Sequence, residues 1–263
     1  MDLILVSSDH VLFYAHSKIL TGVSKNSFAG LLPPAVRSGS FDMDLELPAV
    51  RVQQSARVLN VVMHALYGFN PAPYAPDLDT LSDAMDALCK TYAIHQSVVL
   101  APSLPLFTIL AAHAPLQPFA VYALAAKHDM EPLAIAASQF LLSYPLSTIT
   151  DDDARRLGAV YLRRLFFLHL GRIDALKRLL GPLPEMHTPT ADCDAKVQEK
   201  LRRAWTLAAA FLIYENRADT TPQSLQATLG PLLNPLWCSD CRQVLSARIQ
   251  SLITQWSTVK TTI

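Results

Sequence analysis

Alternation of apolar and polar positions is confined to the first fifty residues of the chain. A short apolar run at residues 3–6 is followed by turn-forming residues at 7–10 and by alternation over residues 11–15. Residues 42–47 (DMDLEL) alternate acidic with apolar side chains, and Pro48 follows them. The pattern predicts an amino-terminal hairpin and a later strand with one solvated face.

Elsewhere in the amino-terminal half, apolar positions recur with the period of a helix. Residues 17–32 form the first such stretch, and two prolines follow it; residues 56–67 form the second, and Gly68 follows it. The third repeats its apolar side chains at steps of three and four: Leu78, Leu81, Met85, Leu88 and Tyr92. We predict three amphipathic helices, and an ion pair between Asp86 and Lys90 on the third.

Beyond His113 only helical periodicity is left. Six helices are predicted there, at residues 117–128, 132–143, 151–180, 194–216, 222–232 and 241–257. The predicted fold class is therefore α+β and predominantly helical. It comprises an amino-terminal α+β domain over residues 1–113 and an all-α helical bundle over residues 114–263.

Composition and charge narrow the classes of function. Just over half of the residues (51%) are hydrophobic, and 22 basic residues are balanced by 22 acidic ones. Without a basic excess, we expect no nucleic acid partner. The longest apolar runs fall far short of the ~20 residues of a membrane span, and the start of the chain does not resemble a signal peptide, so no membrane partner is expected. Four scattered cysteines make no disulfide scaffold, which favours an intracellular protein, cytoplasmic or nuclear.

Several positions match a known family pattern. The opening passage has a strand, a hairpin partner ending in a His, an Ile-Leu pair, a Ser and a Phe: Asp2, Phe13, His16, Ile19, Leu20, Ser24 and Phe28. Further on come the stretch PFAVYALAAKHDMEPLAIAASQFLLSYPL and the element WCSDC at residues 237–241. In these features the chain resembles BTB/POZ domain-containing proteins of the large fungal type. One residue more than usual separates Ser24 from Phe28, which predicts a bulged or realigned first helix.

The resemblance implies a BTB/POZ-like domain over residues 1–113 and a non-catalytic role in protein–protein interaction. Such domains bind themselves or a partner, so a protein partner or a homodimer is expected. The implied interface comprises Phe13, His16, Ile19, Leu20, Val23 and Phe28. Two alternatives stay open, a substrate adaptor of a cullin-type ubiquitin ligase and a zinc-stabilised transcriptional regulator. Adaptors often carry an apolar-x-Glu element after the third helix, and the loop GFNPAPYAPDLD holds no Glu, which disfavours the adaptor.

The sharpest local motif is the C-x-x-C formed by Cys238 and Cys241. Two thiolates at this spacing bind one zinc ion, but a closed site needs two further ligands. The sequence holds no second C-x-x-C and no H-x-x-x-H, and His187 and Cys193 lie in a loop that would have to fold back to supply them. The motif is a zinc site, a redox pair or a pair of structural thiols at a helix start. The sequence by itself favours structural thiols.

Motifs for catalysis are missing from the sequence. It contains no G-x-S-x-G, no H-E-x-x-H and no glycine-rich phosphate loop, and its eight histidines are scattered. The acidic run at residues 151–153 is either a cation site or a helix start. Three consecutive acids diverge around a helix, and acids suit its positive end, so the helix start is favoured. We expect that the protein is not an enzyme.

The predicted helix at residues 151–180 is apolar on much of its circumference. Its main stripe comprises Leu157, Tyr161, Leu165 and Leu168. Phe166, Phe167 and Leu170 lie off that stripe, which indicates either a central place in the core or a binding face; we favour the core. Arg156 and Arg163 give the helix a basic side. A solvated face is favoured there over a surface for nucleic acid or an acidic peptide.

Overall fold

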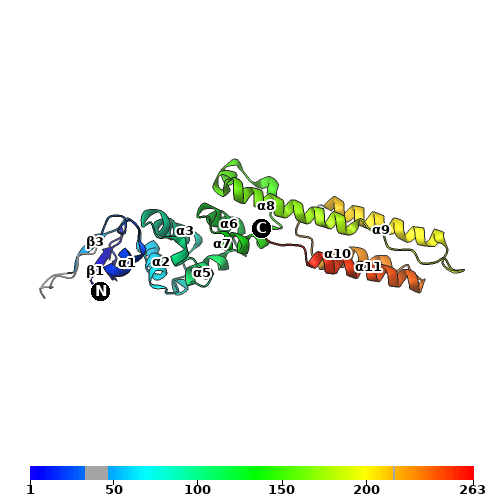
Figure 1. The fold of residues 1–263 in the computed structure, drawn as a ribbon, viewed down its shortest axis with the longest axis horizontal. Coiled ribbons are helices and arrows are strands. Elements are labelled where there is room, and N and C mark those ends of the chain that lie inside the picture. Colours follow the sequence, from blue (N-terminus) through cyan, green and yellow to red (C-terminus); the bar gives the residue numbers. More distant parts are fainter. Residues whose placement is uncertain (33–46, 216) are drawn as a thin grey trace. The chain divides into compact units, whose positions relative to one another are not determined.

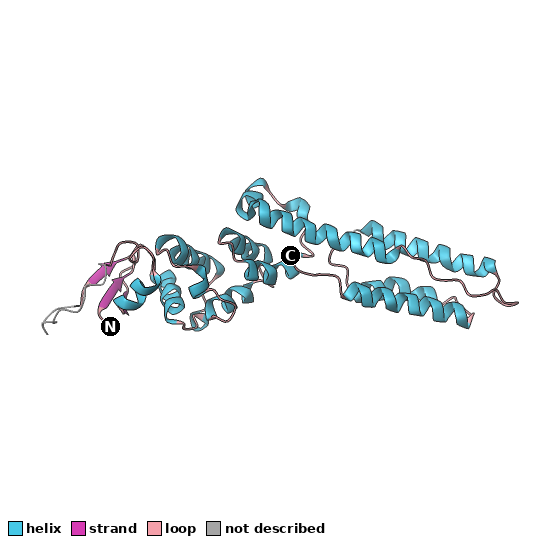
Figure 2. Ribbon diagram, in the orientation of Figure 1, coloured by secondary structure: helices cyan, strands magenta, loops and turns pink. Residues whose placement is uncertain are grey.

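The computed structural model describes residues 1–32, 47–215 and 217–263, and it is predominantly helical, as predicted (Figure 1). Its strands all lie near the amino terminus of the described chain (Figure 2). The chain divides into two units, Met1–Ala137 and Ser138–Ile263. These are the amino-terminal unit and the carboxy-terminal unit. The division falls after residue 137, whereas the sequence placed it after residue 113.

The sheet of the amino-terminal unit has β1 (Leu3–Val6) at its centre. β1 pairs antiparallel with β2 (Leu12–Ala15) and parallel with β3 (Ala49–Arg51). Ser7 closes the hairpin between β1 and β2, because its hydroxyl accepts a hydrogen bond from the Val11 N–H at 2.9 Å. The predicted hairpin is confirmed.

The strand predicted from acidic–apolar alternation lies outside the described residues, apart from Leu47. Pro48, which the sequence places at the end of that strand, accepts a hydrogen bond from the Ile4 N–H at 2.9 Å. β3 then begins at Ala49, which is aligned with Ile4 of β1. In the described residues, Pro48 and the β3 strand after it therefore both pair with β1.

The first helix is shorter than the predicted stretch of residues 17–32. α1 (Ser17–Val23) ends where Ser24 adopts extended backbone angles. Three residues of the turns that follow have positive φ: Ser27, Phe28 and Ala29. The Ser24 hydroxyl accepts the Phe28 N–H at 2.7 Å, and the Phe28 ring stacks on Tyr92 with centroids 3.7 Å apart. The bond from Phe28 to Ser24 and the stack of Phe28 on Tyr92 hold the segment in turns. The stack joins distant parts of the sequence, so helical periodicity does not reveal it.

The second and third predicted helices are confirmed, whereas the helix predicted at residues 132–143 is shorter and ends at Ser138. α2 (Ala56–Tyr67) ends at Gly68, whose φ of +70° is left-handed geometry that glycine adopts without a Cβ clash. α3 (Leu78–Asp86) continues into a π-helical turn, η2 (Ala87–Thr91). The others are η1 (Ala72–Tyr74), α4 (Gln96–Val99), α5 (Pro105–His113), α6 (Pro118–Lys127) and α7 (Glu131–Ser138). The core contains the fully buried side chains of Leu5, Leu20, Phe28, Leu59, Leu81, Met85, Leu88, Tyr92, Leu106 and Tyr122.

The regular elements of the carboxy-terminal unit are all helical in its described residues. Its elements are η3 (Gln139–Leu141), η4 (Leu146–Thr148), α8 (Asp151–Leu180), α9 (Ala195–Glu215), α10 (Pro222–Leu229), η5 (Gly230–Leu233) and α11 (Ser239–Ser257). Trp205 and Trp256 are buried in its core, and their indole N–H groups donate to the carbonyls of Leu180 at 3.1 Å and Thr220 at 2.9 Å. Both rings thereby bury their apolar area without leaving a donor unpaired.

The acidic run at residues 151–153 forms the first turn of α8, which is the alternative that the sequence favoured. The Asp153 N–H donates to the Thr150 hydroxyl at 3.1 Å, and the Asp153 carboxylate reaches back to the Thr150 N–H at 3.2 Å, which completes a capping box. The acidic run is therefore a helix start. Within the element, Gly158 has non-helical angles (φ 67°, ψ 163°), and the helix kinks there.

The apolar residues off the main stripe of α8 are exposed. Phe166, Phe167 and Leu170 are 38%, 64% and 54% exposed, so the prediction that they belong to the core is wrong. The reason is that the main stripe already occupies the core side of the helix: Leu157, Tyr161, Leu165 and Leu168 are all buried. The structure therefore does not support the core interpretation of these three residues.

Candidate metal centre

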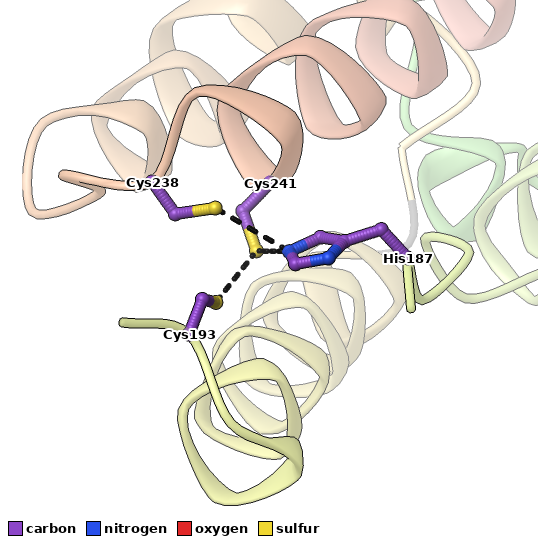
Figure 3. Close-up of side chains that lie close together, drawn as sticks. All are labelled: His187, Cys193, Cys238 and Cys241. Carbon is purple, nitrogen blue, oxygen red and sulfur yellow. Dashed lines mark hydrogen bonds between the residues drawn. The ribbon is translucent and has the colours of Figure 1, made fainter. Parts of the chain in front are cut away.

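Four metal-ligating side chains converge in the carboxy-terminal unit (Figure 3). His187 and Cys193 come from the loop between α8 and α9, and Cys238 and Cys241 come from the start of α11. Their ligand atoms, one imidazole nitrogen and three sulfurs, all lie within 4.8 Å of one another. In Figure 3 the four side chains point toward one another from two separate parts of the chain.

The start of α11 positions the two cysteines of the C-x-x-C motif. Cys238 is the N-cap residue of α11 and has extended backbone angles, whereas Cys241 lies in the first helical turn. This arrangement directs both sulfurs to the same side of the helix start (Figure 3). The Arg242 guanidinium donates to the Leu236 carbonyl at 2.6 Å and fastens the preceding segment. Cys241 is buried and Cys238 is half-buried.

A tight turn before α9 positions Cys193. The backbone N–H groups of Thr190 and Cys193 donate to each other's carbonyl oxygens at 3.0 and 3.3 Å. The Thr190 hydroxyl accepts a further hydrogen bond from the Cys193 N–H at 3.1 Å. Asp194 then caps α9, because its carboxylate accepts the Val197 N–H at 2.9 Å. The turn and the cap hold Cys193 in place with 1% of its surface exposed.

The distances between the ligand atoms suit a shared ion better than a covalent bond. Cys193 Sγ lies 3.6 Å from Cys241 Sγ, far beyond the ~2.05 Å of a disulfide. His187 Nε2 lies 3.3 Å from the sulfurs of both Cys238 and Cys241. Zinc–sulfur bonds of about 2.3 Å and a zinc–nitrogen bond of about 2.0 Å imply tetrahedral edges of roughly 3.5–3.8 Å. The cluster is therefore close to the size of a zinc site.

The His187 ring is held as a metal ligand would be. Its Nδ1 lies 2.8 Å from the Thr188 carbonyl oxygen, which accepts a hydrogen bond only from a protonated Nδ1. Nε2 then directs its lone pair at the sulfurs. The same carbonyl raises the pKa of His187. The amide nitrogen of Gln198, a buried residue, lies 3.5 Å from Nδ1, and this side chain packs beside the ring without accepting its proton. A hydrogen bond from the second ring nitrogen to a backbone carbonyl is a usual environment of a metal-bound histidine.

The three thiols differ in how readily they ionise. The backbone N–H of Cys241, followed by that of Asp240, stabilises the Cys238 thiolate and lowers its pKa to about 7. Burial raises the pKa of Cys193 and raises the pKa of Cys241 to about 12. One thiol of the cluster ionises easily, and the other two are buried. A divalent cation suits such a site, because its charge offsets the free-energy cost of ionising the buried pair.

Sequence reasoning identified the C-x-x-C pair but named His187 and Cys193 only as loop residues that would have to fold back. The structure brings all four together. It also adds two residues that no pattern indicated, Thr188 and Gln198. The signal was weak, consisting of a His and a Cys in a loop with three prolines between two helices. Ligands on separate segments share no spacing, so the sequence pattern does not join them.

The residues that the BTB/POZ resemblance assigns to an interface do not form one exposed surface. Leu20 and Phe28 are fully buried, so their side chains are part of the core and are not available to a partner. The other four are half-buried: Phe13, His16, Ile19 and Val23. His16 is also engaged within its unit, because its backbone N–H donates to the Tyr67 hydroxyl at 2.8 Å and its Nδ1 lies 3.0 Å from the same oxygen.

A second cluster of titratable groups lies in the amino-terminal unit. Asp86 accepts hydrogen bonds from Lys127 Nζ at 2.6 Å and pairs with Lys90 at 3.2 Å, which confirms the predicted ion pair. His128 Nε2 lies 3.0 Å from Asp86 Oδ1, and burial lowers the pKa of His128. One carboxylate that faces two ammonium groups is an ion network and not a metal site, because ammonium groups have no lone pair to donate to a cation.

Comparison with known proteins does not place the chain in a family. None of the helices that the structure describes is both long enough and apolar enough to cross a membrane. The proposed function rests on the cluster formed by His187, Cys193, Cys238 and Cys241. No protein-family model, no curated protein and no solved structure matches the chain.

Proposed function

We propose that the chain is a non-catalytic protein-binding protein whose carboxy-terminal unit is stabilised by one structural zinc ion. The observation that carries the proposal is the set of four ligand atoms, three sulfurs and one nitrogen, within 4.8 Å of one another. Structural zinc sites use four protein ligands of these types, whereas catalytic sites keep one position for water or substrate. A complete protein ligand set therefore favours a structural role over a catalytic one.

Zinc accounts for the cluster better than the other interpretations of the C-x-x-C motif. Thiolate ligands in a tetrahedral set are typical of zinc or of iron–sulfur clusters, and a mixed set of three sulfurs and one imidazole around one point suits a single zinc ion. A redox pair or a pair of inert thiols gives no reason for an imidazole lone pair 3.3 Å from two sulfurs. It also gives none for the third sulfur.

The zinc ion would join segments that the rest of the core holds only in part. Cys193 and Cys241 belong to the same hydrophobic core as Trp205 and Leu245. The ion would therefore fix the loop before α9 to the start of α11 at one end of that core. Metal binding of this kind contributes directly to folding free energy, since the site is not formed in the unfolded chain.

Exposed apolar side chains support the protein-binding part of the proposal. On α8 these include Phe167 and Leu170, and on α9 they include Leu207, Phe211 and Tyr214. Residues 207, 211 and 214 are spaced by four and three, so they share one face of α9. Large exposed apolar residues grouped on one helix face favour a protein interface over a purely solvated surface.

The BTB/POZ resemblance extends the proposal to the amino-terminal unit, which would associate with itself or with a partner. β2 is an edge strand of the described sheet, and its Leu12 and Tyr14 side chains are exposed. An edge strand offers unpaired backbone groups to another chain. This supports self-association through β2, which also carries the half-buried Phe13.

Metal analysis tests the zinc site. The full chain, purified under reducing conditions, is expected to contain one zinc ion per molecule by inductively coupled plasma mass spectrometry. Cys193→Ala and Cys241→Ala are each expected to lose it, because three ligands bind zinc far more weakly than four. Cys89→Ala is the matched control, since Cys89 lies in the amino-terminal unit outside the cluster. A metal-free wild type after zinc supplementation, or loss of zinc in Cys89→Ala, would contradict the proposal.

Affinity purification of the tagged full chain from its native cells tests the binding role. Recovery of a protein partner in stoichiometric amounts is expected, with mass spectrometry identifying it. A cullin scaffold would specify a ligase adaptor, whereas chromatin factors without a cullin would specify a zinc-stabilised regulator. A chain that comes down alone, and is monomeric by light scattering, would remove the binding role.

A further inference from the structure

A groove runs along α8 on the carboxy-terminal unit, separate from the metal cluster. It encloses about 640 Å³ between one face of α8 and the segment that follows α11. Its apolar lining comes from Phe167, Leu168 and Ala175 on α8 and from Val259 and Ile263 on the facing segment. Neither the predicted core stripe nor the zinc site accounts for an open apolar channel at this place.

The rim of the groove is basic. Arg163, Arg164 and Arg178 line it from α8, and Lys260 lines it from the facing segment, while no Asp or Glu is among its lining residues. Two of these cations have contacts of their own. Arg178 pairs with Asp174 at 2.8 Å, and the Arg164 guanidinium lies 5.5 Å from the Tyr161 ring centroid. The positive charge of the rim therefore rests on Arg163 and Lys260.

A buried guanidinium beneath the groove adds to the positive potential. Arg172 is buried, and its N–H groups donate to the carbonyl oxygens of Ala218 at 2.7 Å and of Val259 and Lys260 at 3.1 Å. These partners are neutral, and the Asp219 carboxylate, which also pairs with Arg217 at 2.8 Å, offsets part of the Arg172 charge. The hydrogen bonds of Arg172 hold the facing segment beside α8, which gives the groove a built wall. Its apolar floor and positive rim are therefore parts of one preformed site.

Gly171 leaves space in the middle of the groove. It lines the channel on the same face as Phe167 and Ala175, four residues away on either side. A Cβ at this position would meet no other atom within 4 Å. Glycine is a poor residue for a helix interior, so its presence costs helix stability and keeps the channel open.

We infer that this groove binds a short acidic segment of a partner protein, with apolar side chains seated on the floor and carboxylates facing the rim. The inference deepens the protein-binding function proposed above and rests on it. Charge complementarity selects the occupant, because an acidic segment meets Arg163 on one wall and Lys260 on the other, and the described lining side chains include no Asp or Glu. Among the described residues of the lining, Phe167 is the one aromatic side chain, and the rest of the floor is aliphatic. This favours a peptide over single-stranded nucleic acid, which relies on several aromatic stacking platforms.

Peptide selection tests the inference. A phage library of random 16-residue peptides is panned against the immobilised full chain. The enriched peptides are expected to carry a net negative charge, with Leu, Phe or Trp at helical or alternating spacing. Fluorescence anisotropy with the labelled peptides then gives affinities, which are expected to fall as salt rises because the rim charges are exposed.

Two variants locate the binding site. Gly171→Leu fills the groove and improves helix propensity, so it is expected to fold and to weaken peptide binding tenfold or more. Arg163→Glu combined with Lys260→Glu reverses two rim charges and is expected to weaken it about tenfold. The matched controls are Gln250→Leu on α11 and Lys200→Glu combined with Arg203→Glu on α9, all at exposed positions outside the groove. They are expected to change the affinity less than twofold.

Three results would overturn the inference: selected peptides without acidic character, equal binding to Gly171→Leu and wild type, or displacement of the peptides by a 20-nucleotide oligouridine at lower concentration. The last outcome would assign the groove to nucleic acid. Zinc content and thermal unfolding are measured for each variant. Loss of peptide binding with zinc retained concerns the groove alone, whereas a chain that never binds zinc fails the proposed function first.

Discussion

Two loops in this molecule, one in each unit, are held in place by different means. In the amino-terminal unit, residues 24–32 are fixed by the chain itself. The Ser24 hydroxyl donates to the Tyr92 carbonyl at 2.7 Å and accepts the Phe28 N–H at 2.7 Å. The Phe28 and Tyr92 rings stack almost parallel, at an interplanar angle of 5°. Hydrogen bonds and apolar burial complete this loop without a cofactor.

In the carboxy-terminal unit, residues 181–194 contact α11 at two places. Near the start of the loop, the Pro182 carbonyl accepts a hydrogen bond from Arg248 at 3.1 Å, and further on His187 and Cys193 meet the start of α11. Their contacts with α11 run from sulfur to sulfur and from imidazole to sulfur, at 3.6 and 3.3 Å. Thiols are weak hydrogen-bonding groups, so these contacts contribute little unless a metal ion replaces them with coordinate bonds. The part of the loop around His187 and Cys193 is therefore expected to lose order when the site is empty.

The comparison shows that burial has different meanings in the two loops. Phe28 is buried because an apolar ring gains free energy on leaving water. Cys193 is equally buried, but it offers a small side chain that gains little from burial and much from ligating a metal. Removing the metal should therefore destabilise the carboxy-terminal unit and leave the amino-terminal unit stable. Truncating an apolar side chain such as Phe28 should destabilise the amino-terminal unit and leave the metal site intact.

The largest effect is expected from removing the zinc ion. Structural zinc contributes about 10–16 kcal/mol of apparent binding free energy in small zinc peptides, so a strong chelator should destabilise the carboxy-terminal unit severely. Hydrogen exchange followed by mass spectrometry is expected to show loss of protection in residues 181–194 and at the start of α11. Residues 24–32 are expected to keep their protection. Equal loss in both loops would contradict the comparison.

Truncating Phe28 is expected to have the next largest effect. Phe28→Ala removes a fully buried ring and its stack on Tyr92, which should cost about 3–5 kcal/mol of unfolding free energy. Urea denaturation followed by circular dichroism measures it, and zinc content should not change. Phe69→Ala is the control, because Phe69 is 62% exposed and its loss should cost under about 1 kcal/mol. A drop in zinc content in Phe28→Ala would show that the units are not independent.

Removing the support of His187 should have a smaller effect. Gln198→Ala leaves all four ligands in place but deletes the amide beside His187 Nδ1, and it should weaken zinc affinity about tenfold. Competition with a fluorescent zinc chelator measures this. Gln243→Ala, an exposed position on α11, is expected to bind zinc like the wild type. An unchanged affinity in Gln198→Ala would mean that the Thr188 carbonyl alone orients the ring.

An effect of similar size is expected at Ser24. Ser24→Ala removes a hydroxyl that bonds the Tyr92 carbonyl and the Phe28 N–H, at a cost of about 1–2 kcal/mol. Thermal unfolding of the amino-terminal unit, measured with the zinc site loaded, gives the shift. A loss as large as that of Phe28→Ala would mean that the hydrogen bonds, and not the ring stack, hold this loop.

The sequence by itself determined the helical periodicity, the opening hairpin and the C-x-x-C pair. α2, α9 and α11 lie within a few residues of their predicted ranges, because each is an amphipathic helix with its own start and stop residues. Cys238 and Cys241 are three positions apart at the start of α11, so local geometry alone brings their sulfurs to one side. These features depend on neighbours within one or two turns of chain.

Only the tertiary structure decided where α1 ends, which face of α8 is exposed and which residues complete the metal cluster. α1 stops at Val23 because Phe28 finds Tyr92 more than sixty positions away in the sequence, and no local pattern records that contact. The sequence predicts that Phe167 belongs to the core, but the stripe from Leu157 to Leu168 occupies the core side of the helix and leaves Phe167 exposed. His187 and Cys193 become ligands because folding closes the long separation to α11, and a contact between distant segments has no period in the sequence.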